Sequence, residues 1–302
     1  MKVAVTGATG FIGRHILRAL IQRGHQVLVV GRTPPKGEHQ AVFVEVDLLQ
    51  ERDHAWISAH NPSHLVHLAW YADHGKYWTS PLNLSWCDAT LRLIQSFADQ
   101  GGERVVAAGT CAEYDWSFGY CQEYRTPCKP TSLYGTVKDC TRRMSEKICD
   151  LGNISLVWGR IFMPFGVGEN SQRLLPSVVQ ALSGLRQPFT ISLQQWRDIL
   201  PVEVVADGFA FLTDHHDSGT FNICSGRPTQ LHEVIVGIAD ILGKSSRLFL
   251  DKGDFSINSG SFLVGDNSLL LSKGWCPHYD LWNAIEVYVR KIQDEIEAKS
   301  VK

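Results

Sequence analysis

The chain has no strong excess of either charge and no long run of apolar residues. Its formal net charge is −2 over 302 residues, which favours neither nucleic acid nor an anionic membrane surface as a partner. No apolar run approaches the roughly 18 residues that a membrane-spanning helix needs. Met1 and Lys2 precede a short apolar stretch and then glycines, which is not the pattern of a signal peptide. These absences predict a cytoplasmic protein that binds no nucleic acid and no membrane.

Paired cysteine motifs and a convincing metal site are also missing. The eight cysteines, at positions 87, 111, 121, 128, 140, 149, 224 and 276, form no Cys-x-x-Cys pair. This is typical of reduced thiols and not of disulfides or zinc ligands. Among His60, His64 and His67, Pro62 interrupts any helical register between the first two, and His67 belongs to an apolar strand. We therefore predict no metal. The absence of Gly-x-Ser-x-Gly removes the usual context of a serine hydrolase.

Apolar strands alternate with helical segments over the first half of the chain. The predicted strands are 2–6, 26–30, 42–46, 65–68, 104–108 and 154–160, and the predicted helices are 11–23, 52–59, 82–99 and 132–150. This alternation predicts an α/β fold built on a Rossmann-type, doubly wound parallel sheet with helices on both faces.

Beyond about residue 160 the pattern loosens. Helices are predicted near 174–182, 231–242 and 280–296, and a short strand at 247–250. We expect residues 197–224 to return to the main sheet. The sequence thus predicts a first domain over 1–161 and a smaller C-terminal lobe over 162–302. This lobe would cover the C-terminal edge of the sheet, where open α/β sheets bind ligands.

A glycine-rich turn joins the first strand to the first helix. Residues 7–13 read Gly-Ala-Thr-Gly-Phe-Ile-Gly. Gly7 permits the tight turn, Gly10 lets the backbone approach a pyrophosphate, and Gly13 allows close packing of helix on strand. The position between a strand and a helix is the context that supports this motif. Residues 1–161 are therefore predicted to bind a dinucleotide, and most of 162–302 to bind substrate.

The end of the second strand bears on the choice of dinucleotide. NAD sites place an acid there for the ribose 2′-hydroxyl, whereas NADP sites offer an arginine to the extra phosphate. Here Arg32 follows Gly31, and no carboxylate occurs before Glu38. NADP(H) is favoured, with NAD(H) as the alternative if Arg32 is only a solvated surface residue. Asp47 either binds the adenine amino group or simply caps a helix.

Tyr134 and Lys138 stand four residues apart in the predicted helix 132–150, so they share one helix face. An unperturbed tyrosine ionises near pH 10, and proton transfer near neutrality needs a shift of roughly 3 units, about 4 kcal/mol. Thr110 directly follows the strand 104–108 region at the C-terminal edge of the sheet. The pattern predicts hydride transfer to a carbonyl. Tyr134 would act as proton donor, Lys138 would lower the phenol pKa and hold the nicotinamide ribose, and Thr110 would bind the reacting oxygen.

With these motifs the chain resembles an extended short-chain dehydrogenase/reductase of the NAD-dependent epimerase/dehydratase family, whose usual substrates are nucleotide sugars. The resemblance spans nearly the whole chain. Its further motifs are Val-His-Leu-Ala at 66–69, Pro-Thr-Ser-Leu-Tyr-Gly at 130–135, Arg-Ile-Phe-Met-Pro-Phe-Gly at 160–166, Arg-Asp at 197–198, Phe-Asn-Ile-Cys-Ser-Gly at 221–226 and Gly-Trp-Cys-Pro at 274–277. Residues 109–114 and the loop 70–78 are similar to CDP-abequose synthase-like deoxysugar 4-ketoreductases.

The resemblance implies roles for individual residues. The catalytic residues would be Thr110, Tyr134 and Lys138. The cofactor-binding residues would be Gly7, Thr9, Gly10, Phe11, Ile12, Gly13, Arg32, Asp47, Leu48, Leu68, Ala69 and Lys138. The substrate-binding residues would be Trp70, Arg160, Arg173 and Arg197. Arg197 would hold the nucleotide diphosphate, unless it only forms a buried ion pair with Asp198. A surface charge at a helix start is the alternative for Arg173, and a core anchor is the alternative for Trp70.

Departures from the family pattern narrow the predicted reaction. Sugar 4,6-dehydratases carry Asp-Glu directly after the catalytic threonine, whereas this chain has Cys111 and Ala112. Epimerase-reductases of the GDP-fucose synthase type need a cysteine where Ala112 stands. Met163 replaces a substrate-binding asparagine of many members. Glu113 and Tyr114 are either second proton donors or residues at the edge of the site, and the second is favoured.

These observations predict an NADP-dependent reductase of a nucleotide-linked 4-keto-deoxysugar, in deoxysugar or polysaccharide synthesis. The alternatives are a nucleotide-sugar 4-epimerase with tightly bound NAD and, in another class, a non-catalytic dinucleotide-sensing protein. The resemblance also implies a homodimer formed through the helices near 82–99 and 132–150.

Overall fold

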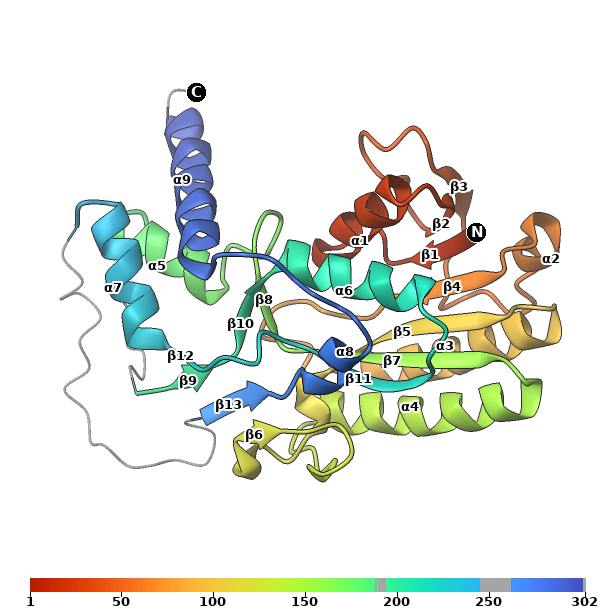
Figure 1. Ribbon diagram of the computed structural model, residues 1–302. Helices are drawn as coiled ribbons and strands as arrows, with labels where there is room; N and C mark the ends of the chain where they lie inside the picture. Colours follow the sequence, from red (N-terminus) through yellow and green to blue (C-terminus); the bar gives the residue numbers. More distant parts are fainter. Residues whose placement is uncertain (188, 190–193, 245–261, 301–302) are drawn as a thin grey trace.

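A seven-stranded parallel sheet forms the centre of the protein (Figure 1). The computed structural model describes residues 1–187, 189, 194–244 and 262–300. The predicted strand at 247–250 lies outside them. The sheet contains β1 (Lys2–Thr6), β2 (Gln26–Gly31), β3 (Val42–Glu45), β4 (His64–His67), β5 (Arg104–Thr110), β7 (Ser155–Ile161) and β11 (Gly219–Ile223). Their order is β11-β7-β5-β4-β1-β2-β3, so the direction of winding reverses between β1 and β4. The predicted doubly wound α/β fold is confirmed.

Helices cover both faces of this sheet (Figure 1). On one face α1 (Phe11–Gln22) packs beside α6 (Val202–Asp214), and on the other α3 (Leu82–Asp99) packs beside α4 (Leu133–Gly152). Strand β1 serves both cores, because Val3 and Val5 join one apolar cluster while Ala4 joins the other. Successive strand residues point to opposite faces. A strand buried on both faces therefore reads as a continuous apolar run, as the sequence does here.

The C-terminal part adds a helical lobe with its own apolar core. Helices α5 (Leu174–Leu182), α7 (Leu231–Ile241) and α9 (Leu281–Ser300) contact one another. Two small sheets connect this lobe to the main one. The first pairs β8 (Met163–Phe165) with β10 (Ile199–Pro201), and the second has the order β12 (Thr229–Gln230), β9 (Trp196–Arg197), β13 (Phe262–Gly265), β6 (Tyr120–Cys121). The short helices α2 (Trp56–His60) and α8 (Ser268–Ser272) complete the described elements. The division at residues 161 and 162 stays a prediction.

Several boundaries differ from the sequence-based expectation, among them those of α2 and β5. The helix expected over 52–59 begins only at Trp56, because His54 has a φ of 49° in the left-handed region, which a right-handed helix cannot contain. Strand β5 extends past residue 108 and ends at Thr110, so this threonine belongs to the strand. Among the described residues, no helix is long and apolar enough to cross a membrane.

His67, at the end of β4, makes stability depend on pH. Its ring is buried between the hydroxyl groups of Thr6, 2.7 Å from Nδ1, and Thr90, 2.9 Å from Nε2. Burial, assisted by the positive charges of Lys138 and His54, lowers the His67 pKa from 6.5 to about 3. In the unfolded chain His67 is protonated below pH 6.5, whereas in the folded protein it is protonated only below about pH 3.

We expect unfolding free energy to fall by about 2 kcal/mol from this group alone between pH 7.5 and pH 5. Urea unfolding at pH 7.5 and at pH 5 measures this difference in unfolding free energy. His67→Gln, which cannot titrate, should reduce the pH dependence by that amount, whereas His216→Gln, at an exposed position, should not. Equal pH dependence in wild type and His67→Gln would contradict the prediction.

Candidate active site

Thr110 and Tyr134 meet at the C-terminal edge of the sheet. Thr110 closes β5 and caps a short 3-10 helix, η1 (Cys111–Glu113), by accepting a hydrogen bond from Ala112 N at 3.2 Å. The N-cap of α4, Ser132, accepts from Gly135 N at 3.1 Å and so sets where the helix starts. This places Tyr134 in the first turn of α4, with its phenol close enough to the Thr110 side chain for that hydroxyl to influence its pKa.

Aromatic rings enclose Tyr134. The ring of Tyr77 lies edge-on at 4.9 Å and that of Trp78 at 5.8 Å between centroids. Burial raises the Tyr134 pKa well above its usual value of 10, and the hydrogen bond from Thr110 only partly opposes this. The largest causes of this shift do not include Lys138, and the predicted lowering of the phenol pKa by Lys138 stays a prediction. A phenol whose pKa is raised is protonated at neutral pH.

The Lys138 ammonium group lies against β5 and two tryptophan rings. Its Nζ donates to Ala108 O at 2.6 Å and lies 4.0 Å from the centre of the Trp70 ring and 5.2 Å from that of Trp158. Burial lowers the Lys138 pKa to about 8, against the opposing charge of Glu113.

Trp70 lies beside the Lys138 ammonium group. The sequence left open whether this residue binds substrate or is a core anchor. Its indole N–H donates to Asn83 Oδ1 at 2.8 Å, and Asn83 is fully buried at the start of α3. The ring is therefore fixed beside the Lys138 ammonium, which it stabilises through its π face. Among the alternatives for Trp70, this arrangement favours an anchor of the catalytic centre.

The glycine turn has the geometry that a pyrophosphate requires. Gly7 has a φ of 70°, and a Cβ there would lie 2.7 Å from Ala69 N, so only glycine fits. A Cβ on Gly13 would collide with the Gly7 carbonyl. The N-cap Gly10 provides no side-chain cap, and the first turn of α1 carries no acid. Its free N–H groups at the positive end of the helix dipole fit a bound phosphate.

The other predicted cofactor residues lie around this turn. Arg32 is exposed at the end of β2 and forms no ion pair with any described residue. The nearest following acid, Glu38, is paired with Arg18 at 2.7 Å. Asp47 Oδ1 accepts from Leu49 N at 3.1 Å, which is a local turn bond. Thr9, Phe11 and Ile12 lie in the glycine turn, buried Leu48 follows Asp47, and Leu68 and Ala69 both donate backbone N–H bonds to Thr6 Oγ1.

Arg160 is corrected as a substrate residue. It is 1% exposed, and its Nε donates to the buried carboxylate of Glu113 at 2.7 Å, while its guanidinium stacks 4.3 Å from the Tyr114 ring. A side chain so enclosed has no surface to offer a substrate. Glu113 and Tyr114 are equally buried, and Tyr114 donates to Asn222 Oδ1 at 2.7 Å, so neither is a free proton donor.

Arg173 and Arg197 remain accessible to a ligand in part. Arg173 pairs with Glu169 at 2.9 Å and lies 5.7 Å from the Phe11 ring, near the glycine turn. Arg197, half-buried in β9, donates to Gln195 Oε1 at 2.8 Å. The neighbouring Asp198 is fully buried and accepts from backbone N–H groups of Ser225, Gly226 and Gly265. Burial raises the Asp198 pKa to about 6.

The positions after Thr110 offer little acid–base chemistry. Cys111 is buried, and burial raises its thiol pKa far above the usual range. Ala112 has no polar side chain. The described site therefore contains a proton donor, a buried cation and an anion-binding turn, without the acid and base that water elimination needs.

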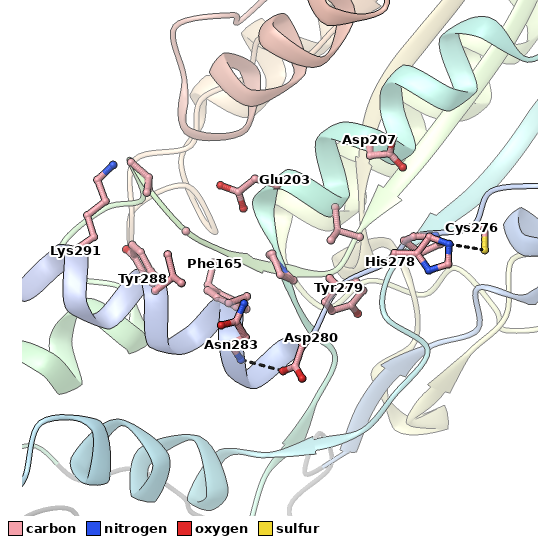
Figure 2. A pocket seen from close by; sticks show the side chains of 17 residues that line it. Phe165, Glu203, Asp207, Cys276, His278, Tyr279, Asp280, Asn283, Tyr288 and Lys291 are labelled. Atoms are coloured by element: carbon pink, nitrogen blue, oxygen red, sulfur yellow. Dashed lines mark hydrogen bonds between the residues drawn. The ribbon is translucent and has the colours of Figure 1, made fainter.

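Two cavities differ in their relation to this site. One of about 180 Å³, lined by Trp78, Ala112, Tyr114, Trp116, Thr131 and Ser132, adjoins Tyr134. A larger one, of about 650 Å³, lies between α6 and α9 and contains none of the three predicted catalytic residues. Glu203 and Asp207 line it from α6, and Asn283, Tyr288 and Lys291 from α9 (Figure 2). We place the chemistry at the smaller cavity, because a reacting group must reach Tyr134.

Sequence reasoning missed two features of the site. The packing of Tyr77 against Tyr134, and of Trp116 against Trp78, carries no pattern in the sequence. Glu113, in contrast, has a signal: Thr110-x-x-Glu113 has the spacing of a capping box, and both of its hydrogen bonds are present. Within the described residues, His215, His216 and Asp217 could group around a metal, but Asp217 already pairs with Lys273 at 2.7 Å.

Comparison with known proteins agrees with this geometry. A dTDP-6-deoxy-L-talose 4-dehydrogenase (NAD(+)) of Aggregatibacter actinomycetemcomitans is 25% identical over 241 residues, which cover 78% of this chain and 88% of that protein. A CDP-abequose synthase of Salmonella typhimurium is 21% identical and covers 96% of this chain and 98% of its own. The fold matches UDP-N-acetylglucosamine 4-epimerase from Methanobrevibacter ruminantium M1, with a TM-score of 0.84, 20% identity and coverage of 97% and 98%.

The model of the NAD dependent epimerase/dehydratase family matches residues 3–224. This span contains the glycine turn and all three predicted catalytic residues. The prediction of an NAD(P)-dependent enzyme is thereby confirmed, and the chain belongs to the NAD-dependent epimerase/dehydratase family of extended short-chain dehydrogenases/reductases.

Proposed function

We propose that the protein is an NADP-dependent reductase of a nucleotide-linked 4-keto-deoxysugar. The observation that carries this proposal is the Tyr134 phenol, which lies half-buried among aromatic rings beside Thr110, where burial raises its pKa. Reduction of a ketone needs a proton donor at this point, and bound NADPH supplies the hydride. An oxidation would need the phenolate, which burial disfavours. Relatives named as a deoxytalose 4-dehydrogenase and an abequose synthase support the substrate class.

The residues of this chain would divide the work as follows. Thr110 and Tyr134 bind the keto oxygen, and Tyr134 donates its proton as charge develops there. Lys138 holds the nicotinamide ribose. The first turn of α1 binds the pyrophosphate, and Arg173 and Arg197 bind the nucleotide part of the substrate. The missing acid and base at Cys111 and Ala112 argue against water elimination or epimerisation at C3 and C5.

The direct test is the fall in NADPH absorbance with nucleotide-linked 4-keto-6-deoxysugars as substrates. The proposal predicts stoichiometric oxidation of NADPH and a reduced sugar product. Failure of every keto sugar to turn over would refute it and revive a dinucleotide-sensing role.

The rival function is a nucleotide-sugar 4-epimerase with tightly bound NAD. Solved structures of similar fold are named as 4-epimerases, one of them in complex with NAD, and this favours the rival. Protein that purifies with bound NAD and interconverts two sugars without net change in nicotinamide absorbance would establish it.

The choice of NADP rests on Arg32. An arginine that is exposed at the end of β2, with no ion pair to any residue the structure describes, can bind a 2′-phosphate. An aspartate there would repel the phosphate and bind the 2′-hydroxyl. Arg32→Asp is expected to change the ratio of kcat/KM for NADPH over NADH by about 10- to 100-fold in favour of NADH. Arg52→Asp, at an exposed arginine that pairs with Asp88, serves as the matched control. Unchanged discrimination in Arg32→Asp would remove the argument for NADP.

We further propose a homodimer in the cytoplasm, formed through α3 and α4. Exposed apolar side chains on or beside these helices, Leu84, Met144 and Leu151, support an interface there. Eight free cysteines fit a reducing compartment.

A further inference from the structure

Glu113 is the centre of a buried polar cluster beneath the catalytic residues. Its side chain has no exposed surface. Oε1 accepts from the Thr110 backbone N–H and from Trp158 Nε1, both at 2.9 Å, and Oε2 accepts from Arg160 Nε at 2.7 Å. Arg142 Nε lies 4.0 Å from Oε2. A carboxylate removed from water keeps its charge only with partners of this kind.

The partners of Glu113 are parts of the active site. The Thr110 hydroxyl lies close enough to Tyr134 to influence its pKa, and the Thr110 backbone N–H donates to Glu113 in the capping box. The Trp158 ring, oriented by its own bond to Glu113, lies 5.2 Å from Lys138 Nζ. One carboxylate therefore fixes both the end of β5 and one wall around the catalytic ammonium.

The packing leaves no freedom at this point. A Cβ added to Gly109 would lie 2.8 Å from Glu113 Oε1 and would collide with Trp158 Nε1. Gly109 is thus the position on β5 that lets the carboxylate and the indole approach the strand. A shorter or displaced side chain at position 113 would no longer accept the hydrogen bonds from Thr110 N and Trp158 Nε1.

Glu113 also acts on the charge of Lys138. Burial lowers the Lys138 pKa, and the charge of Glu113 is the largest influence that raises it again. Cys87, on α3, raises it further, whereas His67, on β4, stays neutral beside it. Glu113 in addition raises the pKa of Tyr134. Removal of the carboxylate charge should lower both pKa values.

We propose that Glu113 is a positioning residue for the reaction: its carboxylate holds the Thr110 backbone and the Trp158 ring so that Thr110, Tyr134 and Lys138 keep their places. This inference rests on the proposed function for its effect on turnover, but not for its effect on Lys138. It assigns a role to a residue that touches neither substrate nor cofactor.

Two variants separate geometry from charge. Glu113→Asp keeps the charge but is one methylene too short, so kcat should fall by about 10- to 100-fold with the alkaline limb of the kcat–pH profile unmoved. Glu113→Gln should lower kcat similarly and move that limb to lower pH. The ¹³Cε signal of labelled Lys138, assigned with Lys138→Met, should titrate at lower pH in Glu113→Gln only.

The control is Glu123→Gln. Glu123 is a partly buried carboxylate that accepts from Asn222 N at 2.8 Å, away from Thr110, and this variant should leave both kcat and the Lys138 titration unchanged. If Glu113→Gln does not fold, the double variant Glu113→Gln/Arg160→Met removes both charges and should show the same two shifts.

The outcomes distinguish this inference from the proposed function. A wild-type enzyme without turnover would refute the function, and the Lys138 titration would then decide the role of Glu113. Two results with an active wild type would overturn the positioning role. One is a Lys138 titration that does not move in Glu113→Gln, and the other is a kcat of this variant that falls only in proportion to its unfolded fraction.

Discussion

Tyr134→Phe is expected to lower kcat for keto-sugar reduction by about 10²- to 10⁴-fold, the usual contribution of a positioned general acid. The phenol is the group that the described site holds next to Thr110 as a proton donor. Phenylalanine keeps the ring contacts with Tyr77 and Trp78, so the fold and the cofactor site should be preserved. NADPH affinity, measured by nicotinamide fluorescence, should change less than about threefold.

Tyr77→Phe is the matched control for this experiment. It removes a hydroxyl from a ring 4.9 Å from that of Tyr134, also at a half-buried tyrosine whose pKa burial raises to about 12. It should retain kcat within about tenfold, because a hydroxyl that transfers no proton supplies at most one hydrogen bond. Equal losses in both variants would mean that packing and not proton transfer is lost. Full activity of Tyr134→Phe would end the assignment of Tyr134 as the acid.

The proposed direction of the reaction rests on the same burial of Tyr134. A phenol whose pKa is raised stays protonated through neutral pH and suits reduction. A 4-epimerase begins with oxidation and needs the phenolate first. In this structure the Lys138 ammonium lies on Ala108 O and Trp70. The raised pKa of Tyr134 is the physical reason to prefer the proposed reductase over a 4-epimerase.

Much of the fold was predictable because it depends on burial patterns that the sequence carries. Helix α3 occupies Leu82–Asp99 and α5 occupies Leu174–Leu182, as predicted, because apolar spacing marks both helices through their last turn. The start of α2 was not predictable, since the positive φ of His54 depends on its buried setting. A helix-period pattern cannot show such a local backbone conformation.

The candidate site also has features that could be predicted from the sequence and features that could not. The glycine turn and the Tyr134–Lys138 spacing are local, so they could be read from the sequence. The direction of the Lys138 side chain was not predictable, because it depends on Ala108, Trp70 and Trp158 from three other segments. Arg160 was misassigned for the same reason: its partner Glu113 is 47 positions away in sequence, and only the fold brings the two charges together.

Lys138→Met is expected to have two opposite effects. It should lower kcat by about 10²- to 10³-fold and weaken NADPH binding, because the ammonium is the cation at the place where the nicotinamide ribose would bind. It should also stabilise the protein. Burial lowers the Lys138 pKa from 10.5 to about 8. Below pH 8 the protonated side chain is therefore less stable in the folded protein than in the unfolded chain. Removing it should raise unfolding free energy at pH 7 by about 1–3 kcal/mol.

Urea unfolding at pH 7 measures this gain, which should shrink as pH rises through 8 toward 10.5 and the lysine loses its proton in both states. Lys147→Met, at an exposed lysine of the same helix, should change neither activity nor stability appreciably. Loss of activity together with loss of stability would make Lys138 a structural residue. If Lys138→Met loses activity but gains stability, the buried ammonium group serves catalysis at the expense of folding stability. Its burial destabilises the folded protein, and only the binding of cofactor and substrate would offset that cost.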